Sequence, residues 1–162
     1  MNVSPGQLQK PEFIDTLLRL IRNHGVRPSG ITLEVTEQVA LRNIEANIAV
    51  LERARRAGMS VALDDFGTGY SSLSLLDRLP LDKLKIDQSV VHSVGKDGGD
   101  SPILKGAIRL AKELGLTSCV EGVSSAEIAR QMQRLGPDEM QGFWIGRPKL
   151  VAPRQDAVRL AS

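Results

Sequence analysis

Polar side chains that can bind a metal ion or move a proton recur near the ends of short β-rich segments in this sequence. They are Asn2, Glu34, Asp64, Asp65, Lys85, Asp87, Glu121 and Gln141. Carboxylates that share one site raise each other's pKa, and a bound divalent cation relieves that repulsion. Oxygen ligands favour Mg²⁺, Mn²⁺ or Ca²⁺ over Zn²⁺. The adjacent pair Asp64-Asp65 can serve one or two metal ions, as in two-metal phosphate hydrolysis.

The segments that must position these groups alternate between strands and helices. Helical stripes of apolar residues run over 13–21, 44–51, 104–111 and 128–135, and Gly58 and Gly115 are placed as C-caps. The β-rich runs between them are Ile31–Thr36, Ser60–Asp64, Lys83–Asp87, Thr117–Val123 and Glu139–Phe143, with Met1–Ser4 as the tail of another strand. This alternation predicts βαβ units and a parallel sheet.

The alternation of polar and apolar side chains along each strand distinguishes between two folds with parallel strands, a doubly wound sheet and a barrel. In Ile31–Thr36 the apolar residues occupy one parity and Glu34 the other, and Lys83–Asp87 repeats the pattern. A doubly wound sheet is covered on both faces and is apolar on both parities, whereas a barrel gathers polar groups at its inner mouth. The sequence therefore predicts an α/β fold, a partial TIM-like (β/α) barrel with about six of eight strands. We expect residues 1–150 to form this domain, 95–102 a flexible loop, and 151–162 a C-terminal tail or helix.

The composition limits the possible environments and partners. A net charge of +2 from 21 basic and 19 acidic residues gives no reason to expect nucleic acid or membrane binding. Cys119 is the single cysteine and lies in an apolar run, which predicts a buried thiol and a reducing compartment. Neither a long apolar run nor a leader-like N-terminus is present, so we expect a cytoplasmic protein.

Six segments, in order, resemble the EAL family of cyclic di-GMP phosphodiesterases. They are Asn2-Val3-Ser4, LEVTE at 33–37, DDFGTGYSSL at 64–73, LKID at 84–87, EGV at 121–123 and QGF at 141–143. The resemblance extends to Arg147-Pro148, and it has both structural and chemical implications. It implies a modified TIM barrel that hydrolyses cyclic di-GMP to linear pGpG with Mg²⁺ or Mn²⁺.

The same resemblance implies a role for each matched residue. Asn2, Glu34, Asp64 and Asp65 would bind metal. Glu121 would lie at the metal site and act as a base for the attacking water, while Lys85 would hold that water or the phosphate. Gln141 and Asp87 would support the site. Glu37 would anchor the loop 66–72, which in the family helps to form a dimer.

Three departures from the family pattern bear on activity. The sequence contains no Glu-Ala-Leu tripeptide, and with it one metal-ligand glutamate of the family is missing. Ser124 stands where the family usually has a second glutamate, and Gly136-Pro137-Asp138 replaces the usual Gly-Cys-Asp. With about six strands, we expect open edges at Met1–Ser4 and Glu139–Phe143 and therefore a homo-oligomer.

Simpler structural explanations exist for individual residues. Asp64-Asp65 can be a solvated turn, Glu34 a strand residue paired to a lysine, and Lys85 the counter-charge of Asp87. At the level of the whole protein, the alternatives are a metal-dependent phosphodiesterase, a catalytically inactive module that binds cyclic di-GMP or another protein, and a gene fragment without a role.

Overall fold

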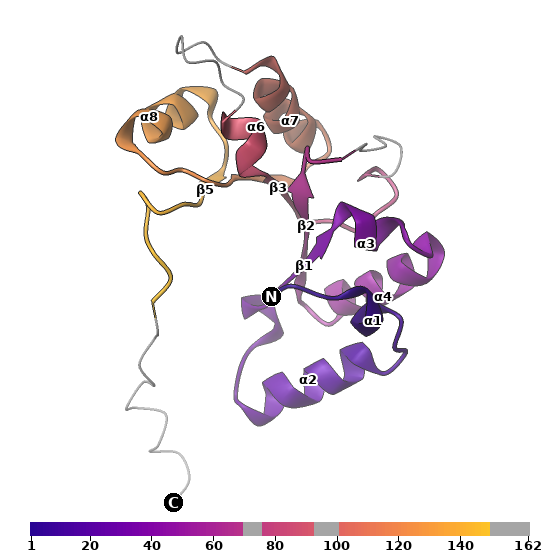
Figure 1. Cartoon of the computed structure of the whole chain (residues 1–162). Helices are drawn as coiled ribbons and strands as arrows, with labels where there is room; N and C mark the ends of the chain where they lie inside the picture. Colours follow the sequence, from indigo (N-terminus) through magenta and orange to yellow (C-terminus); the bar gives the residue numbers. More distant parts are fainter. Residues whose placement is uncertain (70–75, 93–100, 150–162) are drawn as a thin grey trace, which may run out of the picture.

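A computed structural model describes residues 1–69, 76–92 and 101–149 of the chain and shows one parallel sheet (Figure 1). The five strands are paired in sequence order, β1-β2-β3-β4-β5, and the sheet does not close. Their bounds are β1 Thr32–Thr36, β2 Ser60–Phe66, β3 Lys83–Ile86, β4 Thr117–Val120 and β5 Glu139–Met140. The arrangement confirms the predicted α/β partial barrel.

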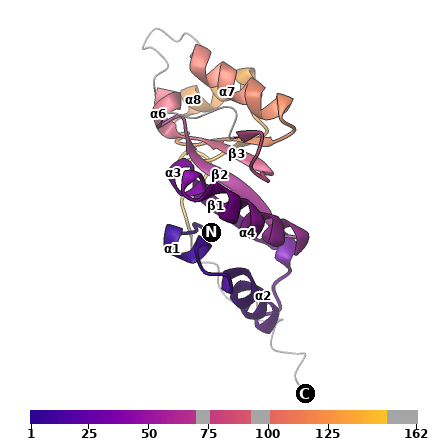
Figure 2. The same cartoon turned by 90° about the vertical axis from the view of Figure 1, so that its right-hand side faces the viewer.

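The helical segments are α1 Pro5–Leu8, α2 Phe13–Asn23, η1 Pro28–Gly30, α3 Glu37–Leu41, α4 Ile44–Arg56, α6 Gln88–His92, α7 Pro102–Glu113 and α8 Ala126–Leu135. Contacts join α3 to β1 and β2, α4 to β2, and α7 to β3 and β4, whereas α2 packs against α4, away from the sheet (Figure 2). All four predicted helical stripes therefore correspond to observed helices.

Local sequence signals explain where the longer helices begin and end. Ser101 caps α7 by accepting a hydrogen bond from the Leu104 amide at 3.3 Å, and Pro102 follows at the first helical position. Gly58 and Gly115, just after α4 and α7, have φ values of 90° and 69°. These left-handed conformations favour glycine and confirm the predicted C-caps.

The apolar residues at alternate positions of each strand lie on its buried side. Leu33, Val35, Val61, Leu84 and Ile86 are all fully buried. Cys119 is 3% exposed, as the apolar run around it predicted, and burial raises the pKa of its thiol to about 11. The other parity faces the concave side and bears the polar groups, so strand alternation separates the core from the site.

The strands at the two edges of the sheet are shorter than the sequence patterns suggested. The tail at Met1–Ser4 contributes a single parallel bridge between Asn2 and Glu34, and β5 has only two residues. Glu121 and Gln141 consequently lie just beyond their strands. Residues 70–72 of the loop 66–72, residues 95–100 of the loop 95–102 and the whole final segment 151–162 lie outside the described residues. Among the described residues, no helix is long and apolar enough to cross a bilayer.

Candidate active site

The buried amine of Lys85 is the centre of the polar site. Its side chain is 8% exposed, and its Nζ atom lies 2.8 Å from Asp64 Oδ1, 2.8 Å from Glu121 Oε1 and 3.2 Å from Glu34 Oε2. These partners come from β1, β2 and the end of β4, so the strand order brings them around β3. The amine neutralises part of a cluster that would otherwise hold only like charges.

The two adjacent aspartates reach the same site because β2 is irregular at its end. The pairing of β2 with β3 shifts between Leu63 and Phe66, so Asp64 and Asp65 together stand opposite Lys85. Asp65 has a φ of 58°, a left-handed conformation that is uncommon outside glycine but tolerated by aspartate. In a regular strand two consecutive side chains would point to opposite faces. The bulge removes that separation.

Carboxylate oxygens of Asp64, Asp65 and Glu121 all lie within 4.8 Å of one another. Three hard oxygen donors at this spacing fit Mg²⁺ or Mn²⁺ and do not favour zinc. Because Lys85 already contacts two of the three carboxylates, a bound cation would share them with the amine. The donor set therefore fits the divalent metal that the sequence predicted.

Electrostatics at the site follow from burial and from the neighbouring charges. The pKa of Asp65 is raised, first by burial and then by the negative charges of Asp64 and Asp87, while Lys85 opposes the rise. Burial lowers the pKa of Lys85, but its hydrogen bonds with Asp64 and Glu121 outweigh that effect and raise the pKa above its usual value. The site thus holds an amine and a carboxyl whose pKa values are both raised, the first by its carboxylate partners and the second mainly by burial.

A cavity of about 460 Å³ opens beside the carboxylates. Its lining includes Asp87 and Gln141, both among the predicted site residues, together with Asp65 and Glu121. Five further residues that the sequence analysis did not assign a role in the site also line it: Gln88, Gly122, Ser124, Gly142 and Phe143. Each follows a predicted site residue by one to three positions, as Gln88 follows Asp87 and Gly142 follows Gln141, and this proximity in sequence is the signal that could have indicated them.

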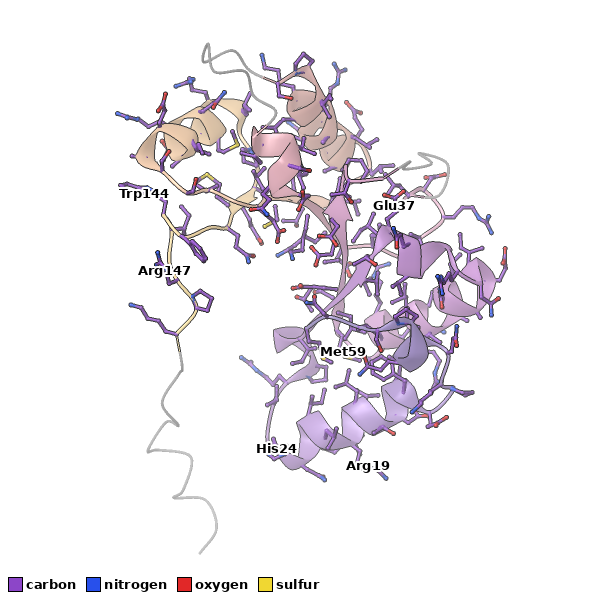
Figure 3. All side chains as sticks on the ribbon, in the orientation of Figure 1. Arg19, His24, Glu37, Met59, Trp144 and Arg147 are labelled. Carbon is purple, nitrogen blue, oxygen red and sulfur yellow. The ribbon has the colours of Figure 1, made fainter. Side chains whose placement is uncertain are left out.

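The remaining predicted residues lie around this centre. Asn2 is bridged through its backbone to Glu34, whose carboxylate also lies 3.9 Å from the N-terminal amine. Glu37 is 7% exposed at the start of α3, and a Cβ atom placed on Gly69 would lie 3.5 Å from its Oε2 atom. Figure 3 shows Glu37 well away from Trp144 and Arg147, which lie on the segment after β5. Glu37 therefore lies next to Gly69 of the loop 66–72, and its role as an anchor of that loop stays a prediction.

Fold and site together define a (β/α) barrel-type domain with a carboxylate and lysine cluster at its mouth. The EAL domain family matches residues 1–148, and the chain belongs to that family. MucR of Pseudomonas aeruginosa, a bifunctional diguanylate cyclase/cyclic di-GMP phosphodiesterase, is 36% identical over 148 residues, which cover 91% of this chain and 22% of MucR.

Two solved structures show the same fold. The EAL domain of Mycobacterium smegmatis DcpA has a TM-score of 0.84 and 41% identity, covering 92% of this chain and 67% of that one. BlrP1 of Klebsiella pneumoniae, in a complex with manganese and cyclic di-GMP, has a TM-score of 0.81 and 36% identity over 91% of this chain and 38% of BlrP1. The chain thus spans about a quarter or less of MucR and about two thirds of the DcpA domain.

Proposed function

We propose that this chain is a divalent-metal-dependent phosphodiesterase that hydrolyses cyclic di-GMP to linear pGpG. The observation that carries the proposal is the convergence of Asp64, Asp65 and Glu121 within 4.8 Å, around the buried amine of Lys85. Membership of the EAL family and the manganese and cyclic di-GMP complex of BlrP1 supply the substrate and metal classes. The metal is Mg²⁺ or Mn²⁺.

In this proposal the metal ligands are Asp64 and Asp65 with Glu121 beside them, extended by Glu34 and the side chain of Asn2. A bound divalent cation supplies Lewis-acid stabilisation of phosphate charge and lowers the pKa of water. Every other contribution comes from the chain's own side chains.

Glu121 accepts the proton of the water that attacks phosphorus, as a positioned carboxylate can do in general base catalysis. The water oxygen forms the new P–O bond, one ester P–O bond of the ring breaks, and the released sugar oxygen gains a proton. Lys85 holds the water or a phosphate oxygen with its charged amine. Asp87 and Gln141 support these groups from the cavity wall.

The direct test follows pGpG formation by chromatography with Mn²⁺ or Mg²⁺, comparing the wild type with Glu121→Gln. Glu139→Gln is the matched control. Glu139 lies on β5, the strand next to β4, and its carboxylate pairs with Lys83 instead of Lys85. We expect turnover in the wild type and the control, and loss of turnover by about 10²-fold or more in Glu121→Gln. Turnover unchanged in Glu121→Gln would contradict the assigned base.

A second candidate function is a catalytically inactive module that binds cyclic di-GMP or another protein. Ser124 favours it, because this residue lines the cavity at the position where the family usually has a second glutamate. Nucleotide binding by calorimetry without turnover, at saturating Mn²⁺, would select this function. Turnover by the unmodified chain would eliminate it.

The open sheet is the basis for a proposed homo-oligomer, through its edges or the loop 66–72. Large apolar side chains are exposed near both edges: Met1 and Leu20 on one side, and Phe143, Trp144 and Ile145 on the other. Unpaired edges and exposed apolar groups both promote association. Light scattering is expected to give a mass of at least twice 17.6 kDa, and a monodisperse monomer would contradict the proposal. Cytoplasmic localisation stays a prediction.

A further inference from the structure

The short helix α6 stands between the ends of β2 and β4, directly after β3. The Asp87 amide donates to the Phe66 carbonyl at 3.1 Å, and the Glu121 amide donates to the Ile86 carbonyl at 3.0 Å. Asp87 also caps α6, because its Oδ1 atom accepts a hydrogen bond from the Ser89 amide at 2.8 Å. The start of α6 is therefore tied to both strand ends that carry the carboxylate cluster.

On the β2 side, α6 meets the chain at a glycine. Gly67 follows Asp65 by two residues and has a φ of 100°. A Cβ atom at this position would overlap the Cγ2 atom of Val90, which is 6% exposed in α6. Thr68 completes this turn by donating from Oγ1 to the Asp65 carbonyl at 2.9 Å. The aspartate pair is thus one tight turn away from a side chain of α6.

On the β4 side, the contact has the same form. Gly122 follows Glu121 directly and has a φ of 74°. A Cβ atom here would overlap the Cβ atom of Gln88 and lie 3.2 Å from its Cα atom. Two glycines, each within two residues of a carboxylate of the cluster, therefore pack against the first and the third residue of one short helix.

We propose that α6 is a spacer that fixes the separation between the Asp64-Asp65 pair and Glu121, with Val90 and Gln88 as positioning residues. The inference rests on the proposed metal-dependent function. An added methyl group at Gly67 or Gly122 must displace α6 or the adjoining turn, and the neighbouring carboxylate moves with that turn. Groups that orient metal ligands typically change metal affinity 10–100-fold when altered.

The test is a double-mutant cycle on the β2 contact. Gly67→Ala is expected to raise the Mn²⁺ dissociation constant about 10-fold in calorimetry. Val90→Ala removes the overlapping Cγ2 atom but not the strain at the left-handed backbone of Gly67, so Gly67→Ala is expected to weaken Mn²⁺ binding less in the Val90→Ala background than in the wild type. Gly58→Ala controls for backbone strain: its φ is 90°, and a Cβ atom there meets only Pro28 at an ordinary 3.8 Å. The control is expected to leave the affinity unchanged.

Hydrogen exchange of the Asp87 and Glu121 amides gives a second readout that needs no metal. Both amides are expected to exchange faster in Gly67→Ala and to recover in the double variant. If Gly67→Ala does not fold, Val90→Ile enlarges the same contact without straining the backbone, and the same changes are expected.

The outcomes separate this inference from the function on which it rests. If the wild type binds no Mn²⁺, the proposed metal site is refuted. The amide exchange rates would then be the only test of whether α6 acts as a spacer. Unchanged amide exchange in Gly67→Ala, or no recovery of exchange in the double variant, would overturn the proposal that α6 is a spacer. Recovery of both affinity and exchange would establish that α6 acts through the Gly67–Val90 contact.

Discussion

Removing the amine of Lys85 tests the electrostatic organisation of the site without relying on turnover. Lys85→Met keeps much of the side-chain length but leaves Glu34, Asp64 and Glu121 without their shared cation. Breaking a buried ion pair by removing one partner costs about 3–5 kcal/mol. The three carboxylates retain 14–25% exposure, so we expect the lower end of that range, about 3 kcal/mol.

Chemical and thermal unfolding measure this loss directly. For a domain of this size, about 3 kcal/mol corresponds to a fall of about 6–12 °C in Tm. Because the folded pKa of Lys85 is raised, its stabilisation is fully present below the ordinary value of 10.5 and is lost only as the pH rises through the higher folded value. The amine's own titration therefore leaves the difference between variant and wild type unchanged from about pH 6 to pH 9.

A matched control lies two residues earlier on the same strand. Lys83 also points to the concave face, but its ion pair with Glu139 is more exposed, at 25% and 47% for the two side chains. Lys83→Met is expected to cost no more than about 1 kcal/mol. Equal losses for Lys83→Met and Lys85→Met, or no loss for Lys85→Met, would refute the argument that burial makes the Lys85 cluster costly to break.

Three further predictions concern the supports of the fold. Asn47, 3% exposed, donates from Nδ2 to three backbone carbonyls at the end of α3; Asn47→Ala is expected to lower the free energy of unfolding by about 1–3 kcal/mol in urea titration. Gly142→Ala would place a Cβ atom onto the backbone of Val123, so we expect a lower Tm together with altered amide chemical shifts around the cavity. Hydrogen bonds from Ser118 lower the pKa of Asp138, and the stabilisation they give is present above the ordinary pKa of 3.8 and lost as the pH falls through the folded pKa. Asp138→Asn should therefore reduce stability at neutral pH and flatten its acid dependence in thermal melts; an unchanged acid profile would contradict this.

Strand parity allowed much of the site to be predicted from the sequence. Glu34, Asp64 and Lys85 occupy the polar parity of three separate segments, and the parallel pairing of those segments puts them side by side. The partners of Lys85 could not be predicted in the same way. The sequence alone suggested Asp87, two residues further along the chain, as the counter-charge of Lys85, whereas Glu34, Asp64 and Glu121 reach the amine from separate segments.

The edges of the fold were harder to predict because pairing partners, rather than local pattern, determine strand length. Thr117–Val123 and Glu139–Phe143 both read as β-rich runs in the sequence, yet β4 ends at Val120 and β5 at Met140. Gly122 and Gly142 sit where the chain leaves the sheet, and each is in close contact with a neighbouring segment. The sequence showed the glycines but not the atoms that they approach.

The adjacency of Asp64 and Asp65 is the feature that local patterns describe least well. A solvated turn would explain two consecutive aspartates before a glycine, but Phe66 is 8% exposed and continues the pairing with Ile86. The chain therefore stays in the sheet and accommodates the extra residue through the left-handed backbone of Asp65. That residue combines an unfavourable backbone conformation with a carboxyl whose pKa is raised by burial and by its neighbours. Strain and crowded charge at one position are expected where a fold serves a site rather than its own stability, and both features support the proposal that the two aspartates are metal ligands.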